Sequence, residues 1–135
     1  MHKKQTPPAV NVYVIDDDDA VRHSLSVMLE LEGYSVWASD HVPEIPVSGT
    51  TSLPLCIILD LQLCDDQCVK CIEAVSGIPN GPRLVVMTGS RGGLARERVR
   101  QAGAHLILDK PFSAVALTGF IDEIADQINE HPAST

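Results

Sequence analysis

Polar side chains that could carry out phosphoryl chemistry follow four short apolar runs, each at the point where the run ends. They are Asp16 and Asp17, Asp60, Thr88 and Lys110. Three gathered carboxylates resist ionising together unless a cation neutralises them, and Mg²⁺ prefers such hard oxygen ligands. An aspartate can be a nucleophile toward phosphorus, while a lysine and a hydroxyl can bind the transferred oxygens. These residue types predict magnesium-dependent phosphoryl transfer to an aspartate, provided that the fold brings them together.

The elements that must position these groups alternate between short apolar runs and helical patterns, which is typical of βαβ units and a parallel sheet. Strands are predicted at 10–15, 34–38, 55–59, 84–87 and 106–108. Helices are predicted from the aspartates to Gly33 and over 66–75, 94–102 and 113–129, with a short or distorted helix in the proline-rich stretch 39–54. Because parallel strands point the same way, we expect the polar side chains along one sheet edge, where open α/β sheets bind ligands.

Length and charge narrow the class of protein. The 135 residues suffice for one domain, expected over 9–130 with loose tails at 1–8 and 131–135. A formal net charge of −8 argues against direct nucleic-acid binding, where a basic face dominates. No apolar run approaches the roughly 20 residues of a membrane helix, and the N-terminus lacks the apolar stretch of a secretory signal. We therefore expect a cytoplasmic protein without membrane contact, in which the 4 cysteines stay reduced.

Four motifs, in order and at strand ends, resemble the receiver domain of two-component response regulators over about 10–128. They are VYVIDDDDAVRHSL, CIILDLQL, LVVMTGS and GAHLILDKPF. The resemblance implies a flavodoxin-like, doubly wound α/β fold with five parallel strands in the order 2-1-3-4-5 and five helices. It also implies Mg²⁺ as cofactor and a sensor histidine kinase or phosphotransfer protein as partner.

The resemblance assigns a role to each site residue. Asp60 matches the phosphoacceptor, Thr88 the switch hydroxyl, and Lys110 the lysine that binds the phosphoryl oxygens. The metal ligands it implies are the carboxylates of Asp16, Asp17 and Asp60 and the backbone carbonyl of Gln62. Such a domain is not an enzyme beyond its own phosphorylation and dephosphorylation. It switches the surface formed by 94–102, 106–108 and 113–129.

Two positions depart from the family pattern. Three residues before the lysine, where the family usually has Tyr or Phe, this chain has Ile107. The usual coupling between the hydroxyl and an aromatic ring is therefore expected to be replaced by another readout. The loop after the phosphoacceptor reads LQLCDDQC in place of the usual Pro and Gly, which leaves the entry into the 66–75 helix open.

Charge on two predicted helices suggests a surface for self-association. The 94–102 helix and the residues just before it carry Arg91, Arg96, Arg98 and Arg100. The 113–129 helix and its end carry Asp122, Glu123, Asp126 and Glu130. Two solvated faces account for this pattern, and the sharper hypothesis is a homodimer in which the two faces pair between copies.

Two local patterns also have structural explanations. Asp18 or Asp19 is expected to cap the first helix, since aspartate is favoured at that position. Cys64, Cys68 and Cys71 have the spacing of an iron–sulfur motif. At i, i+4 and i+7 they share one helix face, so we favour small core residues over a cluster.

Two other functions remain open. Asp16-x-Asp18 after a strand resembles the nucleophile motif of haloacid-dehalogenase-type phosphatases, which would make Asp16 the nucleophile, although Ala20 stands where Thr or Val is expected. Ile107 also fits an unphosphorylated pseudo-receiver that acts as a binding module. The sequence names neither the cognate kinase nor the output.

Overall fold

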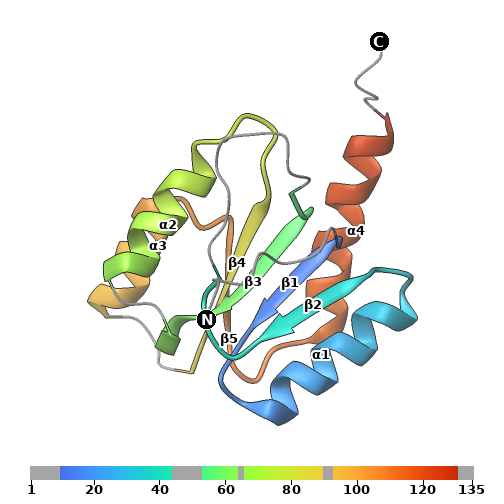
Figure 1. Cartoon of the computed structure of the whole chain (residues 1–135), viewed down its shortest axis with the longest axis horizontal. Helices are drawn as coiled ribbons and strands as arrows, with labels where there is room; N and C mark the ends of the chain where they lie inside the picture. Colours follow the sequence, from blue (N-terminus) through green and yellow to red (C-terminus); the bar gives the residue numbers. More distant parts are fainter. Residues whose placement is uncertain (1–9, 44–52, 64–65, 90–92, 131–135) are drawn as a thin grey trace, which may run out of the picture.

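Five parallel strands form one sheet in the order β2-β1-β3-β4-β5 (Figure 1). The computed structural model describes residues 10–43, 53–63, 66–89 and 93–130. The strands are β1 (Val12–Ile15), β2 (Val36–Ser39), β3 (Cys56–Asp60), β4 (Arg83–Thr88) and β5 (Leu106–Asp109). The helices are α1 (Asp19–Leu31), α2 (Asp66–Ser76), α3 (Leu94–Ala102) and α4 (Ala114–Glu130), with a 3₁₀ turn η1 (Leu61–Leu63). The predicted strand order is confirmed.

Four helices lie within the described residues, whereas five were predicted. The additional helix was expected in 39–54, and most of that stretch lies outside the described residues. That part of the prediction therefore stays open. The helix predicted at 66–75 begins at Asp66 as expected, although the preceding loop lacks the usual Pro and Gly.

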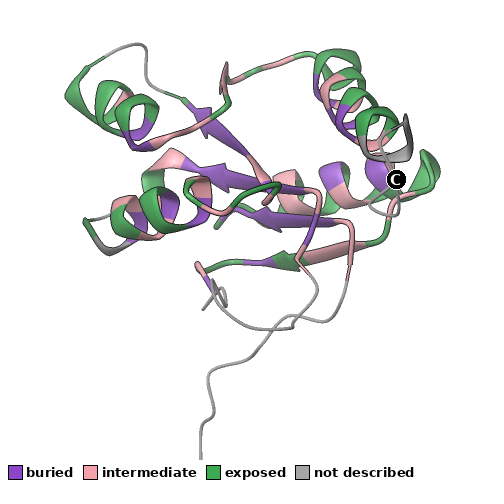
Figure 2. Ribbon diagram, turned by 90° about the horizontal axis from the view of Figure 1, so that it is seen from above, coloured by how far each residue is buried: buried purple, intermediate pink, exposed green. Residues whose placement is uncertain are grey.

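The helices cover both faces of the sheet. On one face, α1 and α4 pack on side chains such as Val14 and Ile58. On the other, α2 and α3 pack on Ile57 and Leu59. Figure 2 shows the central strands as the buried layer between these helices. A strand covered on both faces is apolar at consecutive positions, which explains the unbroken run that ends at Asp60.

Capping fixes both ends of α1. The Asp18 side chain accepts hydrogen bonds from the backbone N–H groups of Ala20 (2.9 Å) and Val21 (3.3 Å). At the other end Gly33 has a φ of 97°, and its N–H donates to the carbonyl of Glu30 (3.0 Å). Both predicted boundaries of this helix are confirmed, and the N-cap is Asp18.

Substitution of Asp18 by alanine should destabilise the chain by about 1 kcal/mol, because two N–H groups of the first turn lose their acceptor. Urea unfolding followed by circular dichroism would measure the change. Ser24→Ala, at an exposed position inside the same helix, should leave stability unchanged or slightly increase it. Equal midpoints for the two variants would contradict the capping role.

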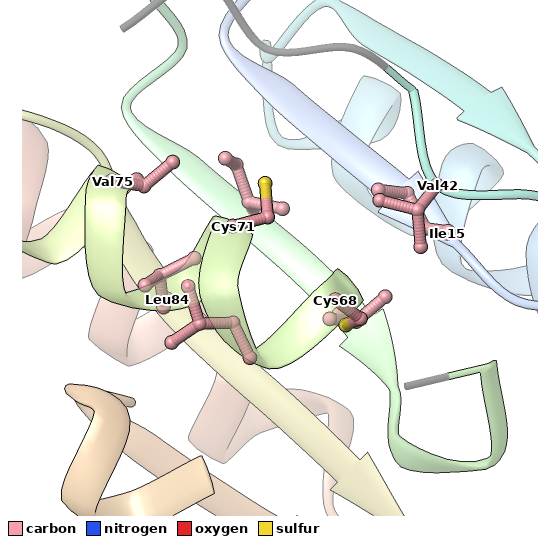
Figure 3. A pocket seen from close by; sticks show the side chains of 9 residues that line it. Ile15, Val42, Cys68, Cys71, Val75 and Leu84 are labelled. Atoms are coloured by element: carbon pink, nitrogen blue, oxygen red, sulfur yellow. The ribbon is translucent and has the colours of Figure 1, made fainter. Parts of the chain in front are cut away.

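The cysteines of α2 contribute to the core. Cys68 and Cys71 point to the sheet and line a small apolar cavity with Ile15, Val75 and Leu84 (Figure 3). The shared apolar face is confirmed for these two, while Cys64 lies outside the described residues. The expectation that all four are reduced is wrong for Cys68, which is disulfide-bonded. Cys71 is a free thiol, and its burial raises its pKa.

Candidate functional site

The carboxyl ends of four strands bring the predicted side chains to one edge of the sheet. Asp16 follows β1, Asp60 ends β3, Thr88 ends β4 and Lys110 follows β5. The backbone N–H of Lys110 donates to the carbonyl of Thr88 (2.7 Å), and the Lys110–Pro111 peptide bond is cis. Residues far apart in the sequence therefore meet as expected, while their chemical roles stay predictions.

Three carboxylates form a cluster at this edge. One oxygen each from Asp16, Asp17 and Asp60 lies within 4.8 Å of the others. Asp16 and Asp60 are buried, at 0% and 1% exposure, whereas Asp17 is exposed to solvent. Such a set of hard oxygen donors, open on one side to water, fits Mg²⁺, which binds through few carboxylates and keeps several waters. The residues present therefore fit the metal that the sequence predicted.

Lys110 supplies the positive charge of the site. Its Nζ donates to Asp16 Oδ2 at 3.0 Å and lies 3.5 Å from Asp60 Oδ2. Burial lowers the pKa of this ammonium group, but its contacts with Asp16 and Asp60 outweigh burial and raise the pKa above the usual 10.5. One ammonium group thus faces two buried carboxylates, which leaves a negative charge that a bound cation would balance.

The surroundings of the Asp60 carboxyl disfavour its ionised form. Burial raises its pKa above the usual 3.8, and the neighbouring charge of Asp16 raises it further. The backbone N–H of Gln62, 3.1 Å from Asp60 Oδ1, and the charge of Lys110 oppose this rise. This contact of the Gln62 backbone N–H was not predicted from the sequence. The metal role of the Gln62 carbonyl stays a prediction.

Ion pairs within the chain engage the arginines of α3. The contacts are Arg96 with Asp109 (2.6 Å), Arg98 with Asp66 (2.6 Å), and Arg100 with Glu97. The first joins α3 to the end of β5, beside Lys110, and the second joins it to α2. A charged surface that pairs with a second copy would have to exchange these partners, at a cost of about 1 kcal/mol or less for each exposed pair.

The strand order defines a flavodoxin-like fold, and its carboxyl edge carries a cluster of carboxylates that could hold a cation. A family model described as the response regulator receiver domain matches residues 12–122. The chain therefore belongs to the response regulator receiver domain family.

Relatives and solved structures agree with this family. The acid tolerance regulatory protein ActR of Rhizobium meliloti (strain 1021) is 29% identical over 107 residues, covering 79% of this chain and 55% of ActR. A CheY-like receiver domain protein from Methanospirillum hungatei JF-1 has a TM-score of 0.70 at 22% identity, covering 89% of this chain and 97% of that one. The beryllofluoride-activated NtrC4 receiver domain dimer has a TM-score of 0.66 at 26% identity, covering 87% and 97%.

The chain spans about half the length of the curated relatives it matches. In the part of the chain that the structure describes, no helix is long and apolar enough to cross a membrane.

Proposed function

We propose that Asp60 of this receiver domain accepts a phosphoryl group, with Mg²⁺ held by Asp16, Asp17 and Asp60. The observation that carries the proposal is the surroundings of the Asp60 carboxylate. It is buried, shares a 4.8 Å cluster with two other carboxylates, and lies 3.5 Å from the Lys110 ammonium group. A nucleophile toward phosphorus needs such positive charge beside it, because the phosphoryl oxygens are negative.

In the proposed reaction, an Asp60 carboxylate oxygen attacks the phosphorus of a partner's phosphohistidine. The new O–P bond forms as the P–N bond breaks, and the departing imidazole keeps the electron pair. Lys110 Nζ and the Thr88 hydroxyl bind the phosphoryl oxygens, and bound Mg²⁺ neutralises part of their charge. The chain thus catalyses only its own phosphorylation, and later its dephosphorylation by water.

The test is phosphoryl uptake from a small donor. With Mg²⁺ and acetyl phosphate, the intact mass of the chain should increase by one phosphoryl group, and EDTA should prevent the increase. No uptake at any Mg²⁺ concentration would favour the pseudo-receiver that binds partners without phosphorylation. Steady turnover of phosphate monoesters would favour the phosphatase with Asp16 as nucleophile, which family membership does not favour.

We further propose a cytoplasmic location and a sensor histidine kinase or phosphotransfer protein as the phosphoryl donor. Membership of the receiver family supports the location and the donor, because phosphoryl transfer requires the receiver and its donor to share one compartment. The disulfide of Cys68 is the observation against a cytoplasmic location, because such bonds are rare in a reducing cytosol. Phosphotransfer from purified kinases to this chain would identify the donor, and equal labelling by unrelated kinases would count against a dedicated partner.

A homodimer through α3, β5 and α4 is also proposed for the phosphorylated state. The beryllofluoride-activated NtrC4 receiver domain is a dimer, and it matches 87% of this chain. If arginines of α3 pair with acidic residues of a second copy, phosphorylation should promote dimers that weaken at high salt and with Arg98→Glu. Light scattering would measure the mass, and dimers insensitive to both changes would exclude this charge pairing.

A further inference from the structure

Four contacts fix Asp16, one at each of its polar groups. Its N–H donates to the carbonyl of Ser39 (3.1 Å), and its Oδ1 accepts from the N–H of Asp18 (2.8 Å). Its Oδ2 accepts from Lys110 Nζ (3.0 Å). The fourth contact involves the backbone carbonyl, which accepts a hydrogen bond of 2.7 Å from Nη1 of Arg22. The sequence pattern alone predicts no role for Arg22.

The guanidinium group of Arg22 lies over the turn between β1 and α1. The Arg22 side chain is only 20% exposed, so it has lost much of its hydration. Its Nη1 bonds the Asp16 carbonyl, and its Nη2 bonds the carboxylate of Asp19. The Asp16 carbonyl belongs to the peptide unit that joins Asp16 to Asp17. The orientation of this unit sets the direction in which Asp17 leaves the buried strand.

We propose that Arg22 is a positioning residue for the metal site, which holds the Asp16–Asp17 peptide so that the exposed Asp17 carboxylate meets the two buried ones. Asp17 needs such a restraint because it lacks the burial that fixes Asp16 and Asp60. Contacts behind metal ligands commonly change metal affinity by about 10- to 100-fold when they are removed. This inference rests on the proposed function, because it assumes that the cluster binds Mg²⁺.

Charge alone predicts the opposite effect. A guanidinium group beside a cation site repels the cation, so its removal should strengthen Mg²⁺ binding. Asp19, whose side chain is 91% exposed, pairs with Arg22 and cancels part of this repulsion. The sign of the affinity change therefore separates a positioning role from an electrostatic one.

The experiment measures Mg²⁺ affinity by isothermal titration calorimetry for the full chain and for Arg22→Ala and Arg22→Lys. Positioning predicts about 10-fold weaker binding for Arg22→Ala and a partial loss for Arg22→Lys, which keeps the charge but not the two-pronged donor. Without metal, hydrogen exchange at the Asp18 amide should become faster in Arg22→Ala, since the turn it belongs to loses a restraint. Circular dichroism establishes that each variant is folded at the titration temperature.

Two controls isolate the contact with Asp16. Asp19→Asn keeps that contact and should change Mg²⁺ affinity by a factor of about two or less. Arg100→Ala removes an equal charge on α3, where Arg100 pairs with Glu97, and should have no effect. Unchanged or tighter Mg²⁺ binding by folded Arg22→Ala would overturn the inference. Absence of Mg²⁺ binding by the unsubstituted chain would instead overturn the proposed function.

Discussion

Substitution of Asp60 by asparagine is expected to abolish phosphoryl uptake from acetyl phosphate and, without divalent cations, to stabilise the chain. The amide is no nucleophile toward phosphorus, so the mass increase should vanish. The stabilisation has a separate cause. Burial, reinforced by the charge of Asp16, raises the pKa of the Asp60 carboxyl, which means that its ionised form is unfavourable in the folded chain. Removal of this charge should add about 1 kcal/mol to the free energy of unfolding.

The pH dependence of stability tests whether ionisation of Asp60 destabilises the folded chain. Because folding raises the pKa of this carboxyl, the folded chain binds the proton more tightly than the unfolded chain. Its contribution to stability is present below the unfolded pKa of 3.8 and is lost as the pH rises through the folded pKa. Urea unfolding in EDTA from about pH 4 to neutral pH should therefore show a gap between variant and unsubstituted chain that widens with pH.

Excess Mg²⁺ should reverse this order, because a cation that binds only the folded chain stabilises it by an amount that grows with the logarithm of its concentration over Kd, and the variant lacks one of the proposed metal ligands. Asp66→Asn is the matched control, since Asp66 is exposed, pairs with Arg98 and lies outside the carboxylate cluster. It should leave phosphoryl uptake intact. Continued uptake by Asp60→Asn would assign the nucleophile to another residue. A variant that is less stable than the unsubstituted chain in EDTA would contradict the claim that ionised Asp60 destabilises the fold.

Parts of the fold that depend on short stretches of sequence could be predicted from those stretches. The bounds of α3, Leu94–Ala102, match the prediction because a glycine with positive φ lies on each side, Gly93 at 91° and Gly103 at 121°. At Gly103 the space is also restricted, since a Cβ there would lie 2.5 Å from the side chain of Ser76. The convergence of Asp16, Asp60 and Lys110 could be predicted because parallel topology alone brings strand ends together.

Contacts at the rim of the site could not be predicted, because long side chains choose their partners by tertiary geometry. Arg98 reaches Asp66 across 32 positions of sequence, from α3 to α2. The charge pattern suggested a surface for a second copy, and it did not predict the partner that this arginine has within the chain. Ile107 packs on the core beneath α2 and α3. From the sequence, this position could be recognised only as one that lacks the usual aromatic ring.

Replacement of Lys110 by alanine should have the largest combined effect on stability and phosphorylation. Without its ammonium group, the buried carboxylates of Asp16 and Asp60 lose the ion-pair partner that the described part of the chain gives them, since Arg22 contacts only the backbone carbonyl of Asp16. Loss of one partner from a buried ion pair costs about 3 kcal/mol, and the side chain of Lys110 is 26% exposed, so about 2 kcal/mol is expected in EDTA. Urea unfolding measures this loss, and phosphoryl uptake should slow by about 10²- to 10³-fold.

The two effects should respond differently to Mg²⁺, because they arise from different charges. A bound cation compensates the carboxylates, so saturating Mg²⁺ should restore most of the lost stability of Lys110→Ala. It cannot replace a donor to the transferred oxygens, and the rate of uptake should therefore stay low. Lys70→Ala, at an exposed position of α2, should change neither quantity. Full recovery of the uptake rate in Mg²⁺ would mean that Lys110 acts only as a counter-ion of the carboxylates. A slow uptake rate in a variant whose stability is fully restored would support a contact between Lys110 and the phosphoryl group.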